Sequence, residues 1–268
     1  MSSTESEEHM KLRDDLRELR TTFSSFRADQ FDYSYLQALK VNVSSMDLDN
    51  PDKKPNFFTA CRASLLLDPD DEYDRGKRIT YPDFESTDPI HRRPIDCAKN
   101  LIAYFSSYIT ANDIGSETKI SATSWSSISL GEKPFDGLDE YKEPEFGVTS
   151  AIRVRNSSHP HVKAMIYNDL EGKDGRLLRG EIILALRIIL AQARWRRLFG
   201  HMTVPVLLFS FMGRQHARII EAYFDGKLLV MRPTRLFDLC DKDKVLIKRF
   251  GQWYFGEPTG ETRKKLRS

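Results

Sequence analysis

The sequence predicts an α/β or α+β protein, in which helices pack on a mixed sheet, with a C-terminal β-meander and a loop-rich N-terminal half. Two observations predict the regular part: apolar residues alternate in several segments after residue 148, and they recur at helical spacing in others. A third concerns residues 41–94, where Pro, Asp and Asn recur and terminate regular structure. The 268 residues fit one large domain or two small ones, and we expect one composite domain.

The N-terminal half begins with a polar segment, residues 1–8, which holds three glutamates and is expected to be a disordered tail. Residues 9–147 are expected to form a helical and loop-rich region. Its first helix is indicated by a stripe of apolar residues at helical spacing, which includes Leu12, Leu16 and Leu19. This helix either docks on its own domain or binds a protein partner. The other expected elements are a short helix near Phe57–Leu67, a helix at 94–113 and a weak strand within 119–129.

The C-terminal half, residues 148–256, is expected to form the α/β core. Its expected elements are strands at 149–155 and 162–167, a helix at Leu177–Phe199, three strands within Val204–Phe237 and a helix at Leu239–Phe255. Asp225-Gly226 favours a tight turn between the last two strands, because both residues tolerate positive φ. Residues 257–268 are interpreted as a basic tail.

Composition and charge limit the partners and the compartment. Lys and Arg number 41 against 39 Asp and Glu, a formal net charge of +2 that forces neither a nucleic-acid nor an acidic partner. Three cysteines make no disulfide framework, and the first residues lack the basic and apolar regions of a secretory signal. The run Ile182–Ala193 is too short to span a bilayer, so no membrane partner is expected. These features predict an intracellular protein, cytoplasmic or nuclear.

Several C-terminal segments resemble a family of proteins from filamentous fungi. The resemblance is carried by RGEIILALRIILAQARWRRL, HMTVPVLLFSFMG, QHARIIEAYFDGKLLVMRPTRLFDL and QWYFG, within Arg176–Gly256. It implies a fungal intracellular protein. The family has no known activity, so the resemblance assigns no catalytic residue.

A second resemblance, to nucleases of the PD-(D/E)XK type, concerns the order of the elements. These nucleases carry an acidic-x-lysine motif on a strand, followed by a helix and two more strands. Here VKAMIYNDLEGK supplies Glu171 and Lys173, and the expected helix and strands follow it. The motif lies in the turn after the strand rather than within it, and the earlier strand TSAIRVR lacks the family's aspartate. A degenerate site is therefore expected rather than an active one.

The nuclease interpretation assigns catalytic roles to Glu171, Lys173 and Glu181, and Mg²⁺ ligation to Asp169, Glu171 and Glu181. Carboxylate oxygens bind Mg²⁺, and a nearby lysine orients water or stabilises a phosphate. Mg²⁺ is the only cofactor that the sequence suggests. The alternative is that these Asp, Glu and Lys residues form an ordinary surface turn with solvated charges.

Two glutamates lie among apolar residues, where an unpaired carboxylate is costly to bury. Glu181 is near the start of the long helix, where its negative charge would interact favourably with the helix dipole or would pair with Arg176 or Arg179. Glu221 lies in RIIEAYF, on a strand face that either lines a cleft or reaches solvent.

Basic residues cluster toward the end of the long helix. Six arginines lie between residues 176 and 197, and Trp195 stands among the last three. Such a patch can neutralise phosphates and stack a base. The predicted nucleic-acid-binding residues are Arg187, Arg194, Trp195, Arg196 and Arg197. Alternatively, arginines in a last helical turn complement the helix dipole. The basic tail, with Arg263, Lys264, Lys265 and Arg267, is a second candidate for the same partner.

Other function classes lack their motifs. No serine stands in a G-x-S-x-G elbow, no glycine-rich phosphate loop is present, and Cys and His have no zinc-site spacing. The leading hypothesis is a nuclease-like nucleic-acid-binding protein, active or degenerate. The alternative is a non-catalytic protein-interaction or regulatory protein, and an enzyme acting on small molecules is a third possibility. The sequence leaves open whether the protein is an enzyme.

Overall fold

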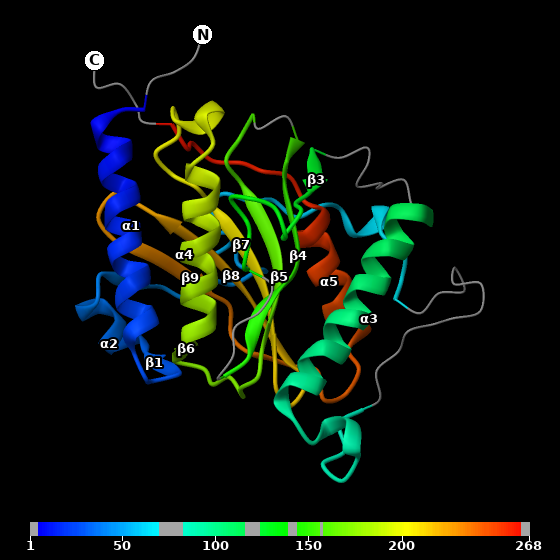
Figure 1. The fold of residues 1–268 in the computed structure, drawn as a ribbon. Helices are drawn as coiled ribbons and strands as arrows, with labels where there is room; N and C mark the ends of the chain where they lie inside the picture. The colour runs from blue at the N-terminus through cyan, green and yellow to red at the C-terminus, as the bar shows by residue number, and fades with distance from the viewer. Residues whose placement is uncertain (1–4, 70–82, 116–123, 139–143, 156–157, 264–268) are drawn as a thin grey trace.

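The computed structural model describes residues 5–69, 83–115, 124–138, 144–155 and 158–263. Within these ranges a mixed eight-stranded sheet lies between two layers of helices (Figure 1). The predicted fold class, a mixed sheet with packed helices, is therefore confirmed.

The sheet joins strands from both halves of the chain. Its order is β2 (Val41–Val43), β9 (Leu229–Pro233), β8 (His216–Phe224), β7 (Val206–Met212), β5 (Val162–Asn168), β4 (Phe146–Val154) and β3 (Trp125–Ser127), and β10 (Phe237–Asp238) pairs with β8. The pairs β5–β7 and β2–β9 are parallel, and the other pairs are antiparallel. A separate two-stranded sheet pairs β1 (Gln30–Asp32) with β6 (Arg176–Leu178).

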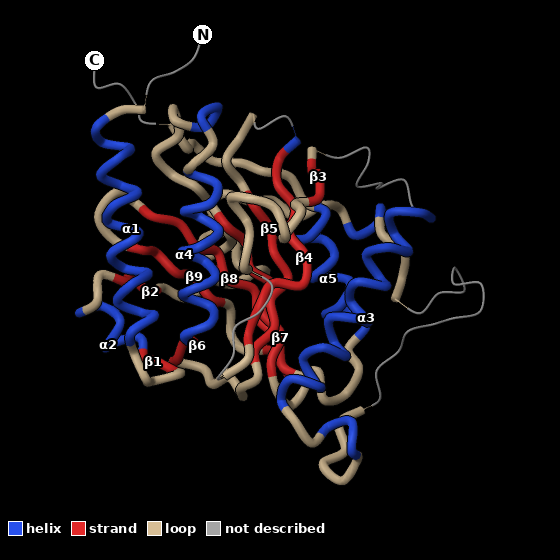
Figure 2. Tube along the Cα trace, viewed as in Figure 1, coloured by secondary structure: helices blue, strands red, loops and turns tan. Residues whose placement is uncertain are grey.

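Four long helices cover the two faces of the sheet. They are α1 (Glu7–Ser25) and α4 (Arg179–Ala193) on one face, and α3 (Pro94–Gly115) and α5 (Lys244–Phe255) on the other (Figures 1 and 2). The short α2 (Tyr33–Ala38) follows β1. In the described part of the chain, no helix is long and apolar enough to cross a membrane.

Alternation along the strands builds a core on each face of the sheet. On β7, Val206 and Leu208 belong to the core beneath α1 and α4, whereas Leu207, Phe209 and Phe211 belong to the core beneath α3 and α5. All five side chains are fully buried. Burying a side chain of this size contributes about 1.5–3 kcal/mol, so this strand alone is a substantial part of both cores.

The predicted C-terminal meander is confirmed. Strands β7, β8 and β9 pair antiparallel in sequence order. Gly226 has a φ of +98°, and the Asp225 carboxylate accepts the N–H groups of Lys227 and Leu228 at 2.8 Å. The connection spans four residues, because the Asp225 side chain organises a wider turn than the two-residue hairpin that Asp-Gly favours.

Three helix ends differ from the prediction, and a capping side chain sets two of them, the starts of α1 and α5. α1 begins at Glu7, inside the segment expected to be a disordered tail, because Ser6 caps it by accepting the N–H of His9. α4 ends at Ala193 rather than Phe199, and α5 begins at Lys244, where the Asp243 side chain accepts the N–H of Leu246.

Two expectations for irregular segments are corrected. The short helix expected near Phe57–Leu67 is only a 3₁₀ turn at Ala63–Leu65. The first part of the expected basic tail packs back on the fold: Phe58 bridges to Pro258, and His201 bridges to Arg263. The remaining tail residues, 264–268, lie outside the described residues.

Candidate functional site

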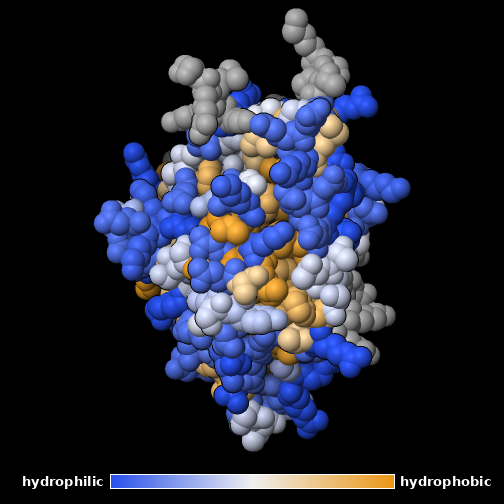
Figure 3. Space-filling view, turned by 90° about the vertical axis from the view of Figure 1, so that its left-hand side faces the viewer, coloured by the Kyte–Doolittle hydropathy of each residue, from blue (hydrophilic) through white to orange (hydrophobic). Residues whose placement is uncertain are grey.

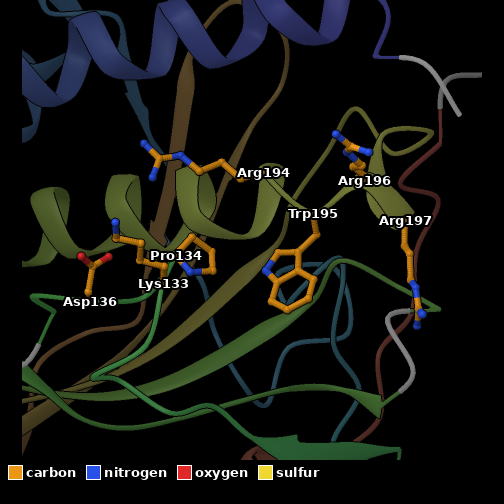
Figure 4. A pocket seen from close by; sticks show the side chains of 7 residues that line it. All are labelled: Lys133, Pro134, Asp136, Arg194, Trp195, Arg196 and Arg197. Carbon is orange, nitrogen blue, oxygen red and sulfur yellow. The ribbon is translucent and has the colours of Figure 1, made fainter. Parts of the chain in front are cut away.

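The candidate site is a surface pocket of about 670 Å³ at the end of α4 (Figure 4). Two segments far apart in the sequence form it: the loop after β3 and the residues that follow α4. The lining residues are Lys133, Pro134, Asp136, Arg194, Trp195, Arg196 and Arg197. Four of the five residues predicted to bind nucleic acid therefore lie together, in what we call the arginine–tryptophan pocket.

The arginines reach this pocket because α4 ends early. The N–H groups of Arg194 and Trp195 bond carbonyls three residues back, which tightens the chain after Ala193. A 3₁₀ turn at Arg196–Leu198 follows, and buried Leu198 anchors it to the core. The arginines are therefore exposed on an irregular segment, and the interpretation of them as a last helical turn is wrong.

Trp195 is the aromatic residue of the pocket. Its indole is half-buried and packs against the core beneath α4. The guanidinium of Arg153, from β4, lies 4.2 Å from the ring centroid, within cation–π distance. Burial lowers the pKa of Arg153 because desolvation disfavours the charged form, and the indole partly compensates that cost. Figure 4 shows the indole directed away from Arg197.

Positive charge extends from the pocket toward α1. Arg194 is exposed but partly desolvated, which lowers its pKa, and Arg17, Arg13 and Arg20 of α1 lower it further, whereas Asp136 opposes them. Hydrophilic side chains cover much of the side on which α1 lies (Figure 3). Arg13 pairs with Glu5 and Arg17 pairs with Asp14, so the positive charge that would attract anions is centred on the pocket arginines.

Arg187, the fifth predicted nucleic-acid residue, does not line the pocket. It is half-buried, and its Nη2 donates to the main-chain carbonyl of Asp136 at 2.9 Å. Phe135 and Leu138, in the same loop, are buried. Arg187 therefore positions the loop that forms one wall, and direct binding of nucleic acid by Arg187 stays a prediction.

The turn predicted to hold a nuclease site has separate partners for its side chains. Asp169 accepts the N–H of Ile95 at 2.9 Å, in the first turn of α3. Glu171 forms an exposed ion pair with Arg214 at 3.0 Å. Lys173 is exposed in the turn that follows β5. The elements β5, α4, β7 and β8 occur in the order that the nuclease resemblance implies, with the short strand β6 inserted between β5 and α4.

Glu181 lies on the first turn of α4 and is fully buried. Its carboxylate accepts the N–H of Leu178 at 2.8 Å and forms a bidentate ion pair with Arg218 of β8, where Nε donates at 2.8 Å. Its ion-pair partner is therefore Arg218, and the expectation of Arg176 or Arg179 is wrong. A pair of this kind links α4 to the sheet, since removal of either partner leaves the other charge buried without its ion-pair partner.

The three carboxylates predicted to bind Mg²⁺ are thus not brought together. Among the described residues, one group places three metal-ligand atoms within 4.8 Å of one another, and it contains none of these carboxylates. Catalysis and Mg²⁺ binding by Glu171, Lys173 and Glu181 stay predictions, and Glu181 would first have to leave Arg218.

Glu221 is also buried in an ion pair. One oxygen accepts the N–H of Phe57 at 2.8 Å, and the other pairs with Arg232 at 2.7 Å. Burial raises the pKa of Glu221, although these partners act in the opposite direction. Glu221 therefore neither lines a cleft nor reaches solvent, and both alternatives considered from the sequence are wrong.

Four residues around the pocket were not predicted. Lys133, Pro134 and Asp136 lie on a loop without periodicity, so nothing in the pattern could assign them to a site. Arg153 was visible as a charge within the strand at 149–155, and its place beside an indole depends on the fold. No family model, no curated protein and no solved structure matches this chain, so the pocket itself carries the functional argument.

Proposed function

We propose that this protein binds single-stranded nucleic acid in the arginine–tryptophan pocket. The observation that carries the proposal is the arrangement of exposed Lys133, Arg194, Arg196 and Arg197 around a half-buried indole. Cationic side chains bind phosphates, and an indole stacks a base without regard to its identity. A volume of about 670 Å³ is within the range of small-ligand pockets, so one nucleotide fits.

A single strand suits the pocket better than a duplex. Trp195 lies inside a concavity and is half-buried, so a base must leave its stack to reach the ring. Bases of a duplex stay stacked unless unpairing energy is supplied, whereas unpaired bases are free to turn outward. We therefore expect preference for single strands over duplexes of the same length.

The proposed role is binding rather than cleavage. Among the described residues, Asp136 is the only acidic one that lines the pocket, and no histidine or cysteine of those residues lines it. Acid–base or two-ligand metal chemistry needs at least a second such group nearby. Within the nuclease-like interpretation, this corresponds to the degenerate form.

The protein-partner alternative depended on the apolar stripe of the first helix. Leu12, Leu16, Leu19 and Phe23 are buried and belong to the core that α1 shares with α4. The stripe is therefore used inside the molecule, and a partner would have to contact the polar side of α1. Because this stripe is not available to a protein partner, we favour nucleic acid as the ligand over a protein bound by the first helix.

The test is fluorescence anisotropy with a labelled single-stranded oligonucleotide, repeated over a series of salt concentrations. Trp195→Ala should weaken binding about 5- to 150-fold, because a stacked base contributes about 1–3 kcal/mol, and should leave the salt slope unchanged. The double variant Arg194→Ala/Arg197→Ala should flatten the slope of log affinity against log salt by about 1.4, or about 0.7 for each lost phosphate contact.

Two matched controls test whether binding depends on the pocket residues or on any exposed arginine or aromatic side chain. Arg92→Ala removes an exposed arginine next to α3, on the other side of the sheet, and Tyr35→Ala removes an exposed ring on α2. Both should bind as the wild type does, and Trp195→Phe should retain most of the affinity. No binding at low ionic strength, or equal losses in controls and pocket variants, would overturn the proposal.

A further inference from the structure

A second cluster of chemically active side chains lies where β10 pairs with β8. His216, Asp238 and Cys240 each place one potential ligand atom within 4.8 Å of the other two. Asp238 and His216 are direct partners in the antiparallel register, and Cys240 follows two residues later. None of these residues lines the arginine–tryptophan pocket, so the cluster is independent of the proposed function.

Hydrogen bonding defines which nitrogen of His216 is available. Nδ1 lies 3.2 Å from the carbonyl oxygen of Gly213, so the ring N–H donates there. The lone pair is then on Nε2, which lies 4.0 Å from a carboxylate oxygen of Asp238. A backbone carbonyl that holds the distal N–H is the usual support of a metal-binding histidine. His216 Nε2 and the Asp238 carboxylate oxygen, which both have lone pairs available to a metal ion, therefore face each other.

The cysteine completes the group. The Cys240 thiol donates to the carbonyl of Arg214 at 2.8 Å, and the Cys240 N–H donates to the Asp238 carboxylate at 2.8 Å. Arg214 and Gln215, in the turn before His216, both have a φ of 52°. The N–H of Leu239 bonds the carbonyl of Gln215 at 2.9 Å, so backbone pairing holds the two ligand-bearing segments together.

We propose that His216 Nε2, the Asp238 carboxylate and the Cys240 thiolate bind a zinc ion, with a water molecule as fourth ligand. Imidazole and thiolate favour zinc over Mg²⁺, and three protein ligands with one open position are typical of non-structural zinc sites. Binding forms the zinc–sulfur bond as the thiol proton passes to solvent. Tetrahedral coordination needs ligand atoms about 3.3–3.7 Å apart, so the present spacing has to contract by only about 1 Å.

The surroundings allow this contraction and give the ion access. The Asp238 side chain is 69% exposed, so a small rotation needs little repacking, although it changes the hydrogen bond that Asp238 accepts from the Cys240 N–H. Asp238 also lines a surface depression of about 590 Å³, together with Asp241 and Asp243. These carboxylates attract a cation, although Lys242 and Lys244 on the same depression partly offset them. The bound ion would tie β8 to the segment that leads into α5.

Cobalt(II) is the probe for the first experiment, because it binds at zinc sites and its visible absorption spectrum depends on its ligands. The wild-type protein should bind one equivalent, with tetrahedral visible bands and a thiolate-to-cobalt charge-transfer band, and zinc should displace both. Cys240→Ser should abolish the charge-transfer band. His216→Gln and Asp238→Asn should weaken binding by more than about tenfold, a loss typical even of changes to groups that only support a ligand.

Matched variants give the controls. Cys61→Ser and His159→Gln alter the same residue types outside the cluster and should leave cobalt binding unchanged. Zinc at about 100 times its Kd should also raise the melting temperature of the wild type by several degrees, but not that of His216→Gln. Absence of saturable one-to-one binding, or a charge-transfer band that survives in Cys240→Ser, would overturn the proposal.

Discussion

Buried histidines make this fold sensitive to acid at the level of single residues. His161 is fully buried just before β5, and its ring N–H donates to the carbonyl of Thr259 at 2.8 Å. Burial lowers the pKa of His161 to about 4, and the nearby charges of His159, Lys163 and His201 act in the same direction. The folded protein therefore accommodates the neutral ring and resists its protonation.

The free energy of unfolding should fall as the pH drops from 6.5 toward 4. In the unfolded chain His161 takes up a proton near its ordinary pKa of 6.5, whereas in the folded chain it does so only near 4, so acidification favours unfolding. The contribution is complete above pH 6.5, and its loss is on the order of 3 kcal/mol for this residue. Urea unfolding at a series of pH values measures it.

His161→Gln should reduce that pH dependence, and His159→Gln, which removes one nearby charge but keeps the buried ring of His161, should reduce it much less. His201, whose pKa burial also lowers to about 4, accounts for a further part. Equal slopes of stability against pH for His161→Gln and the wild type would contradict this explanation.

The contacts of individual buried side chains were the part of the structure that the sequence predicted least. Lys163 lies within the strand pattern VKAMIY. Alternation assigns its side chain to one face of the strand but does not say which residues pack against that face. In the fold it is fully buried, donates to the carbonyls of Tyr254 and Gly256 at 2.8 and 2.5 Å, and lies 4.1 Å from the Trp125 ring. Burial lowers the pKa of Lys163 well below its ordinary value. Its partners are about 90 residues away, a distance that no local pattern reports.

At the scale of elements, the turn between β8 and β9 provides a prediction about backbone geometry. Gly226→Ala should destabilise the protein by about 1 kcal/mol, because φ is +98° and an L-residue is strained there. A methyl group at this position meets no atom within 4 Å, so packing does not contribute. Chemical denaturation measures the change.

Gly200→Ala is the matched control for this turn. Its added methyl group also meets no atom within 4 Å, and its φ is not in the positive region. Gly200→Ala also reduces the conformational entropy of the unfolded chain, but it introduces no backbone strain. It should therefore leave the free energy of unfolding unchanged or raise it slightly. Equal destabilisation by both substitutions would show that positive φ at Gly226 is not the cause.

Strands and long helices were predictable because period-2 and helical spacing report burial directly. Thus 149–155 and 162–167 correspond to β4 and β5, and 94–113 to α3. The end of α4 was not predictable, since arginine is a good helix former and Arg194–Arg197 carry no breaker. Buried Leu198 and the packing of Trp195 decide that end, and both depend on tertiary contacts.

At the scale of the whole molecule, the N-terminal half contributes to the same structure as the C-terminal half. β2 pairs with β9, β1 pairs with β6, and α1 packs on α4. A fragment of residues 1–147 should therefore show no cooperative thermal transition by circular dichroism, whereas the full chain should unfold in one step. A sharp transition in the fragment would mean that residues 9–147 are a domain of their own.

The two edges of the eight-stranded sheet have a consequence for solubility. At one edge β2 contributes three residues, and at the other β3 covers three residues of β4, while the loop after β3 bonds Val148 and Ala151 of β4. Long bare edges recruit strands from other molecules and begin aggregation. A formal net charge of +2 supplies little mutual repulsion between copies. We therefore expect the short, partly covered edges, rather than charge, to limit association between copies of this protein.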